Sequence, residues 1–210
     1  MGYLIVWGMI SIFVMLCMIN VTNKRESGTY QWNKCIFALL AVFTGISLVC
    51  GYIIGLKSVS EMAEIRLTIS YFIILGAAVI DWKLHIIPNF LSGTLVGARV
   101  VLLVFEIIQG TEISSSVLDS GLGAVLCILI INIANKFSKD GIGKGDLKLL
   151  MALGFMCGTH IVFTVFLYAL ICCSVFTVIL IALKKATIKE HLAFGPFIYA
   201  GYVVMLLCSI

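Results

Sequence analysis

Long apolar stretches, interrupted by short polar ones, run along almost the whole of this 210-residue chain. An α-helix that crosses a bilayer needs about 20 predominantly apolar residues, and seven stretches come close to that length. An eighth stretch, 146–157, is too short to cross alone, which indicates either a re-entrant segment or a short helix shielded by its neighbours. The seven predicted membrane helices cover about residues 2–20, 36–55, 67–82, 90–108, 117–136, 160–183 and 193–210.

The pattern therefore predicts an all-α, polytopic membrane helix bundle with seven or eight membrane segments. Nothing along the chain has the polarity of a separate soluble domain, so residues 1–210 are expected to form a single integral-membrane domain. Residues 1–20 lack the basic start and small-residue cleavage site of a secretory signal peptide. We expect them to remain in the protein as its first membrane helix.

The composition excludes a water-soluble class. Hydrophobic residues make up 62% of the chain and charged residues 11%, whereas soluble domains carry about one quarter charged residues. The net charge of +4 is too small to indicate a nucleic-acid partner. The eight cysteines lie mostly inside apolar stretches and form no CxxC pair, which indicates packing residues rather than disulfides or a metal site.

The placement of basic residues predicts the orientation. Ten of the 14 lysines and arginines lie in four alternate polar stretches, 21–35, 83–89, 136–145 and 184–192. Because Lys and Arg favour cytoplasmic loops, these stretches are expected in the cytoplasm and the N-terminus outside a cell membrane. This alternation holds only if 146–157 returns the chain to the far side, which favours a true crossing.

Two aspartates lie at the margins of apolar stretches. Asp81 ends the run 71–80, and Asp146 begins the run 147–156. The predicted topology places both at the cytoplasmic edge of the membrane, where an ionisable residue usually marks a functional site. Taken singly, Asp146 is also typical of a helix N-cap, and Asp81 with Lys83 and His85 is typical of an interfacial cluster.

Two neighbouring carboxyl groups could hydrolyse a peptide bond. In a poor dielectric both cannot easily ionise, so the pair shares one proton. One carboxylate can then take a proton from water while the other polarises the scissile carbonyl. Such a reaction needs no metal or other cofactor.

Three motifs, in this order, resemble the prepilin peptidase family of membrane aspartic peptidases. They are Asp81 followed by Pro88-Asn89, then Gly143-Lys144-Gly145-Asp146-Leu147-Lys148-Leu149, then Phe194-Gly195-Pro196-Phe197, in which Ala193 stands where proline is usual. The resemblance covers about residues 70–200. It implies an endopeptidase that removes the leader peptide from a prepilin or pseudopilin precursor with an apolar N-terminal helix. It also implies that Asp81 and Asp146 are catalytic.

The resemblance extends to residues that could support the aspartates or contact substrate: Pro88, Asn89, Gly143, Gly145 and Lys148. We expect the two glycines to permit positive φ and close backbone approach, so that an extended substrate could lie against this turn. Lys148 is expected either to hold the Asp146 carboxylate ionised or to extend towards the membrane interface.

The chain departs from many bacterial members in the stretch 21–34, which is short and contains no cysteine. This indicates a peptidase without the methyltransferase domain. A presenilin-like or signal-peptide-peptidase-like protease is an alternative, although no Pro-Ala-Leu element is present and Ile80, not tyrosine, precedes Asp81. A small proton-coupled transporter is another, and Arg99 would suit it unless Arg99 pairs with Glu106. The particular pilin-like substrate and the oligomeric state are left open.

Overall fold

The computed structural model describes residues 7–17, 34–57, 60–110, 113–138, 143–183 and 193–208. Every regular element in these ranges is an α-helix, which confirms the predicted all-α class. The helices are an N-terminal helix Trp7–Cys17, α2 (Lys34–Lys57), α3 (Glu61–Leu84), α4 (Asn89–Ile108), α5 (Ile113–Ser138), α6 (Lys144–Cys157), α7 (Thr159–Ala182) and α8 (Gly195–Cys208).

Four of the described helices, α3, α4, α5 and α7, are long and apolar enough to cross a membrane. The N-terminal helix, the part of α2 from Val42 to Leu56, and α8 are shorter apolar helices. The apolar pattern predicted that this helix begins at about residue 67, whereas α3 begins at Glu61. Ser60 caps this earlier start by accepting a hydrogen bond from the Ala63 N–H at 3.2 Å. A polar first turn can thus belong to a membrane helix.

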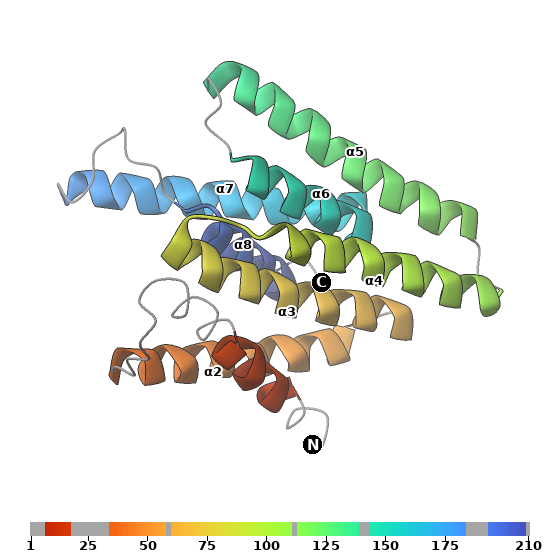
Figure 1. The fold of residues 1–210 in the computed structure, drawn as a ribbon, viewed down its shortest axis with the longest axis horizontal. Helices are drawn as coiled ribbons and strands as arrows, with labels where there is room; N and C mark the ends of the chain where they lie inside the picture. The colour runs from red at the N-terminus through yellow and green to blue at the C-terminus, as the bar shows by residue number, and fades with distance from the viewer. Residues whose placement is uncertain are drawn as a thin grey trace.

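The helix α3 lies at the centre of the bundle and packs against α2, α4, α6 and α8 (Figure 1). Its side chains from Tyr71 to Asp81 are nearly all buried. By contrast α5 and α7 expose many large apolar side chains, as expected for helices that face lipid. The most protected positions of the fold therefore belong to α3 and the helices around it.

Two pairs of helices approach each other at glycines. A Cβ atom at Gly154 of α6 would lie 2.5 Å from the Gly123 carbonyl oxygen of α5. A Cβ atom at Gly201 of α8 would lie 2.6 Å from backbone atoms of Val165 and Ala169 in α7. Because lipid provides no hydrophobic force between helices, such close backbone packing is a main source of association.

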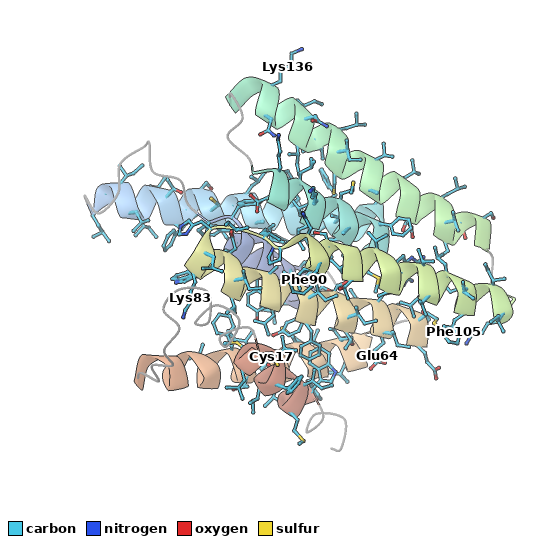
Figure 2. The ribbon with its side chains drawn as sticks, viewed as in Figure 1. Cys17, Glu64, Lys83, Phe90, Phe105 and Lys136 are labelled. Atoms are coloured by element: carbon cyan, nitrogen blue, oxygen red, sulfur yellow. The ribbon has the colours of Figure 1, made fainter. Side chains whose placement is uncertain are left out.

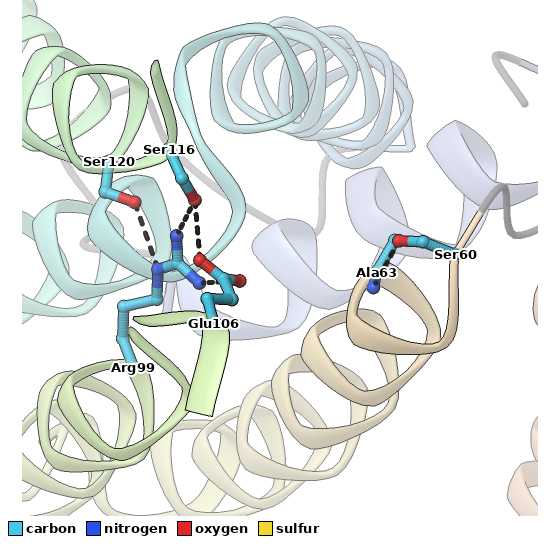
Figure 3. A network of polar contacts seen from close by, with 6 residues as sticks. All are labelled: Ser60, Ala63, Arg99, Glu106, Ser116 and Ser120. Atoms are coloured by element: carbon cyan, nitrogen blue, oxygen red, sulfur yellow. Dashed lines mark hydrogen bonds and ion pairs between the residues drawn. The ribbon is translucent and has the colours of Figure 1, made fainter. Parts of the chain in front are cut away.

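A buried polar network around an ion pair within α4 joins α4 to α5 (Figure 3). Arg99 Nη1 lies 2.9 Å from Glu106 Oε1, and Arg99 also donates to Ser120 at 3.0 Å and to Ser116 at 2.7 Å. Ser116 donates in turn to Glu106 at 2.7 Å. Of the two roles considered for Arg99, the structure shows the pairing with Glu106, which satisfies a charge that would otherwise be costly inside the bundle.

Two lysines mark one end of the bundle. Lys83 and Lys136 lie near the same end of α3 and α5, while Glu64 and Phe105 lie towards the other (Figure 2). The basic stretches predict a common end for Lys83 and Lys136, and the side of the membrane on which that end lies stays a prediction. The stretches 18–33, 139–142 and 184–192, which carry most of those basic residues, lie outside the described residues.

We expect Gly154→Ala to destabilise the protein by about 1–3 kcal/mol, because its Cβ would overlap the α5 backbone and force α5 and α6 apart. Thermal unfolding in detergent measures the effect. Gly97→Ala is the matched control, since a Cβ at Gly97 meets nothing within 4 Å. Equal unfolding temperatures for the two variants would contradict the close α5–α6 contact.

Candidate active site

Asp81 lies in the last turn of α3 and is 5% exposed. The helix ends at Leu84, and His85 adopts a left-handed conformation with φ 52°. The His85 N–H donates to the Asp81 carbonyl oxygen at 2.9 Å, which closes the helix. This tight ending holds the backbone of Asp81 while its side chain points into the bundle.

The first residue of α8 supplies a hydrogen bond to this side chain. The Gly195 N–H donates to Asp81 Oδ2 at 2.8 Å. The first N–H groups of a helix have no partner within the helix and attract anionic groups. A Cβ at Gly195 would lie 2.9 Å from both Cβ and Oδ2 of Asp81, so the position requires glycine. This contact gives a physical role to the motif around Phe194-Gly195-Pro196.

Asp146 lies in the first turn of α6 but is not its N-cap. The N-cap is Gly143, whose φ is −64°. The Gly143 N–H donates back to the Asp146 carboxylate, as the acidic residue of a capping box would accept. A Cβ at Gly143 would lie 3.0 Å from Asp146 Oδ2. The N-cap alternative for Asp146 is thus wrong, and the carboxyl group is held by a neighbouring backbone N–H.

The two aspartates come together where α3 packs against α6. Asp146 is half-buried, and the Asp81 carboxyl group is close enough to act on it electrostatically. The structure therefore places both aspartates where the end of α3 lies against the start of α6.

The predicted supporting residues surround the turn between α3 and α4. Pro88 is the N-cap of α4 and Asn89 its first residue. Lys148 Nζ donates to Asn89 Oδ1 at 3.0 Å, and this contact links α6 to the start of α4. A Cβ at Gly145 would lie 3.3 Å from the Ile87 Cβ, so α6 and the turn are in close contact.

The expected positive φ at the glycines is wrong. Gly143 has an extended conformation and Gly145 lies inside α6; among the described glycines only Gly110 and Gly158 have positive φ. Both motif glycines instead allow neighbouring atoms to lie close to the backbone, because a side chain at either position would crowd them. Within the described ranges no group of three or more His, Cys, Asp or Glu residues is placed to hold a metal ion.

Sequence reasoning missed the contact between Asp81 and Gly195, although it singled out the motif that contains Gly195. The available signal was a glycine followed by proline at the start of an apolar helix. Proline is tolerated in the first turn of a helix, where N–H groups lack helical partners. That pattern marks a helix start, yet it does not say which distant side chain will meet it.

Comparison with known proteins gives consistent matches. Residues 67–178, more than half of the chain, match the model of the type IV leader peptidase family. The chain is 37% identical over 70 residues to leader peptidase HopD of Salmonella typhimurium, covering 32% of this chain and 45% of that protein. It is 25% identical over 174 residues to a prepilin leader peptidase/N-methyltransferase of Bacillus subtilis, covering 81% and 60%.

A protein of the same name from Pectobacterium carotovorum is 29% identical over 184 residues, covering 85% of this chain and 63% of that protein. The chain thus spans less than two thirds of the length of these relatives. No solved structure matches it.

Proposed function

Because this chain belongs to the type IV leader peptidase family, we propose that it is a membrane aspartic endopeptidase that uses Asp81 and Asp146. The observation that carries the proposal is the placement of the two aspartates at neighbouring helix ends, Asp81 at the end of α3 against the first residue of α8 and Asp146 in the first turn of α6. Each carboxyl group accepts a hydrogen bond from a backbone N–H at a helix start.

In the proposed reaction the two aspartates share one proton. The ionised carboxylate takes a proton from a water molecule, which attacks the scissile carbonyl carbon. The protonated carboxyl group polarises the carbonyl oxygen and later supplies a proton to the leaving amine. The Gly195 N–H fixes the orientation of Asp81, and the Gly143 N–H fixes that of Asp146.

The supporting residues hold the distance between the two carboxyl groups. Lys148 and Asn89 join α6 to α4, while Gly145 lets α6 rest on Ile87 in the turn that follows Asp81. We therefore assign Lys148, Asn89, Pro88, Gly143 and Gly145 to positioning of the pair. The exposed Gly143 is also assigned to contact with the substrate.

The proposed substrate is a prepilin-like or pseudopilin-like precursor, cut between a polar leader and an apolar helix. A site at the end of a membrane bundle suits such a substrate, since the leader remains in water while the apolar part stays in lipid. The bundle has lipid as its surroundings, and we propose no nucleic-acid partner, metal or other cofactor. Because the stretch 21–34 lacks cysteine, we propose peptidase activity without N-methylation.

The proposed topology has seven or eight membrane segments in one domain. It places the N-terminus outside and the aspartates near the cytoplasmic face of the cell membrane. Lys83 and Lys136 lie near the same end of the bundle, which supports this orientation because basic residues favour the cytoplasmic side.

We expect Asp81→Asn and Asp146→Asn each to lower leader cleavage by at least about 10²–10⁴-fold, since asparagine keeps the shape of the side chain but cannot exchange the proton. The double variant should be scarcely slower than either single one, because the two residues act as a unit. The assay is a gel shift of a co-expressed prepilin, with purified enzyme for rates.

Asp119→Asn is the matched control. Asp119 caps α7 by accepting from the Thr159 N–H at 3.0 Å, a bond that asparagine can still accept. It should cleave at the wild-type rate. Full activity in either Asp81→Asn or Asp146→Asn would remove the basis of the peptidase proposal.

Gly195→Ala should lower the cleavage rate by roughly 10²-fold, because the new Cβ displaces the Asp81 side chain and a misplacement of about 1 Å can cost that much. Gly93→Ala, where a Cβ meets nothing within 4 Å, should leave the rate unchanged. Rates measured on folded, detergent-purified protein decide the matter, and a fully active Gly195→Ala enzyme would show that this contact is not needed.

The orientation can be tested with single cysteines in a background that lacks the native ones. A cysteine at Glu112 should react with a membrane-impermeant thiol reagent added to intact cells, and a cysteine at Lys139 should react only after permeabilisation. These positions flank α5. Labelling of both from the same side would refute the proposed crossing.

A further inference from the structure

A chain of four buried hydroxyl groups crosses the core and connects four helices. Ser11 of the N-terminal helix donates to Ser47 of α2 at 2.7 Å. Ser47 lies 2.7 Å from the Tyr71 hydroxyl of α3, which lies 2.8 Å from the Tyr199 hydroxyl of α8. Ser11, Ser47 and Tyr71 are fully buried and Tyr199 is 6% exposed.

Each hydroxyl group has one proton to donate, and this fixes the direction of the hydrogen bonds along the chain of hydroxyl groups. Ser47 donates its single hydroxyl proton to the Phe43 carbonyl oxygen at 2.8 Å, so it can only accept from Ser11 and from Tyr71. Tyr71 has then used its own proton and must accept from Tyr199. The hydroxyl of Tyr199 is therefore the donor at the far end, and Ser47 is the shared acceptor.

The chain of hydroxyl groups ends one helical turn from the candidate active site. Tyr199 follows Gly195 by four residues on α8, so both lie on the same helix face. The Gly195 N–H moves rigidly with this helix. A hydrogen bond weakens steeply when its length or angle departs from the ideal, so a small slide of α8 would disturb the 2.8 Å contact with Asp81.

Packing alone does not fix such a slide. The Tyr199 ring already packs against the rings of Tyr71 and Phe43, and these apolar contacts would survive if the hydroxyl groups were removed. Burying hydroxyl groups is unfavourable unless each has a partner, and here all four have one. Directional bonds of this kind specify one register among several that apolar packing would allow.

We propose that the hydroxyl chain holds α8 in register, so that Tyr199 and Tyr71 are positioning residues for Asp81 through Gly195. This inference rests on the proposed function. It makes the N-terminal helix and α2, both outside the matched residues 67–178, part of the machinery that sets the active site.

The test compares Tyr199→Phe, Tyr71→Phe and the double variant in leader cleavage and in thermal unfolding. Tyr199→Phe should lower kcat by about 10-fold with KM unchanged, less than the roughly 10²-fold cost of a full 1 Å misplacement. Tyr71→Phe leaves the Tyr199 donor without an acceptor and should unfold at a lower temperature. The double variant should regain unfolding temperature but not kcat, because the orphaned donor is gone and the hydroxyl chain to α8 is still broken.

Tyr168→Phe is the control, because Tyr168 packs on the core from α7 and takes no part in the chain. It should leave kcat unchanged. The inference is overturned if Tyr199→Phe and the double variant keep wild-type kcat, or if kcat follows unfolding temperature across the set. If the wild-type protein cleaves the leader and Asp81→Asn abolishes that cleavage, the proposed function holds, whatever the tyrosine variants do. A wild-type protein that cleaves no leader overturns both.

Discussion

A carboxyl group buried among apolar helices constrains the whole arrangement of this protein. Asp81 is 5% exposed at the end of α3, and the bundle around it is largely hydrocarbon. Groups able to satisfy such a side chain are scarce there, because backbone N–H groups in the middle of a helix are already bonded. Among backbone groups, only helix starts have free N–H donors. The site accordingly forms where α6 and α8 begin, and glycine occupies both donor positions because a Cβ would crowd the carboxylates.

The helices whose first residues form the site, α6 and α8, are held in place in two ways. Close backbone contact at Gly154 sets α6 against α5, and contact at Gly201 sets α8 against α7. Buried polar links then restrict sliding, through the bonds of Arg99 and Glu106 to serines of α5 and through Tyr71 and Tyr199 between α3 and α8. Apolar packing permits several registers, whereas a hydrogen bond of fixed length permits few.

The candidate site is assembled from parts that lie far apart in the chain. Asp81 and Asp146 fall inside the matched residues 67–178, but Gly195 and Tyr199 follow them and Ser11 and Ser47 precede them. The family model begins at residue 67, but the alignments with the Bacillus subtilis and Pectobacterium carotovorum relatives extend into the first third of the chain. The serines of this first third connect to α3, so this part of the bundle has a specific contact with the core as well as an apolar surface.

The sequence by itself determined the all-α class, the approximate helix positions and the two aspartates with their motifs, because apolar length and motif spacing are local patterns. It also identified Glu106 as one of two explanations for Arg99, since both lie on one helix. Only the tertiary structure decided that Gly195 meets Asp81, that Lys148 bonds Asn89 instead of Asp146, and that Gly143 needs close approach and not positive φ. These contacts depend on how distant helices cross and on their register, which no short stretch of sequence encodes.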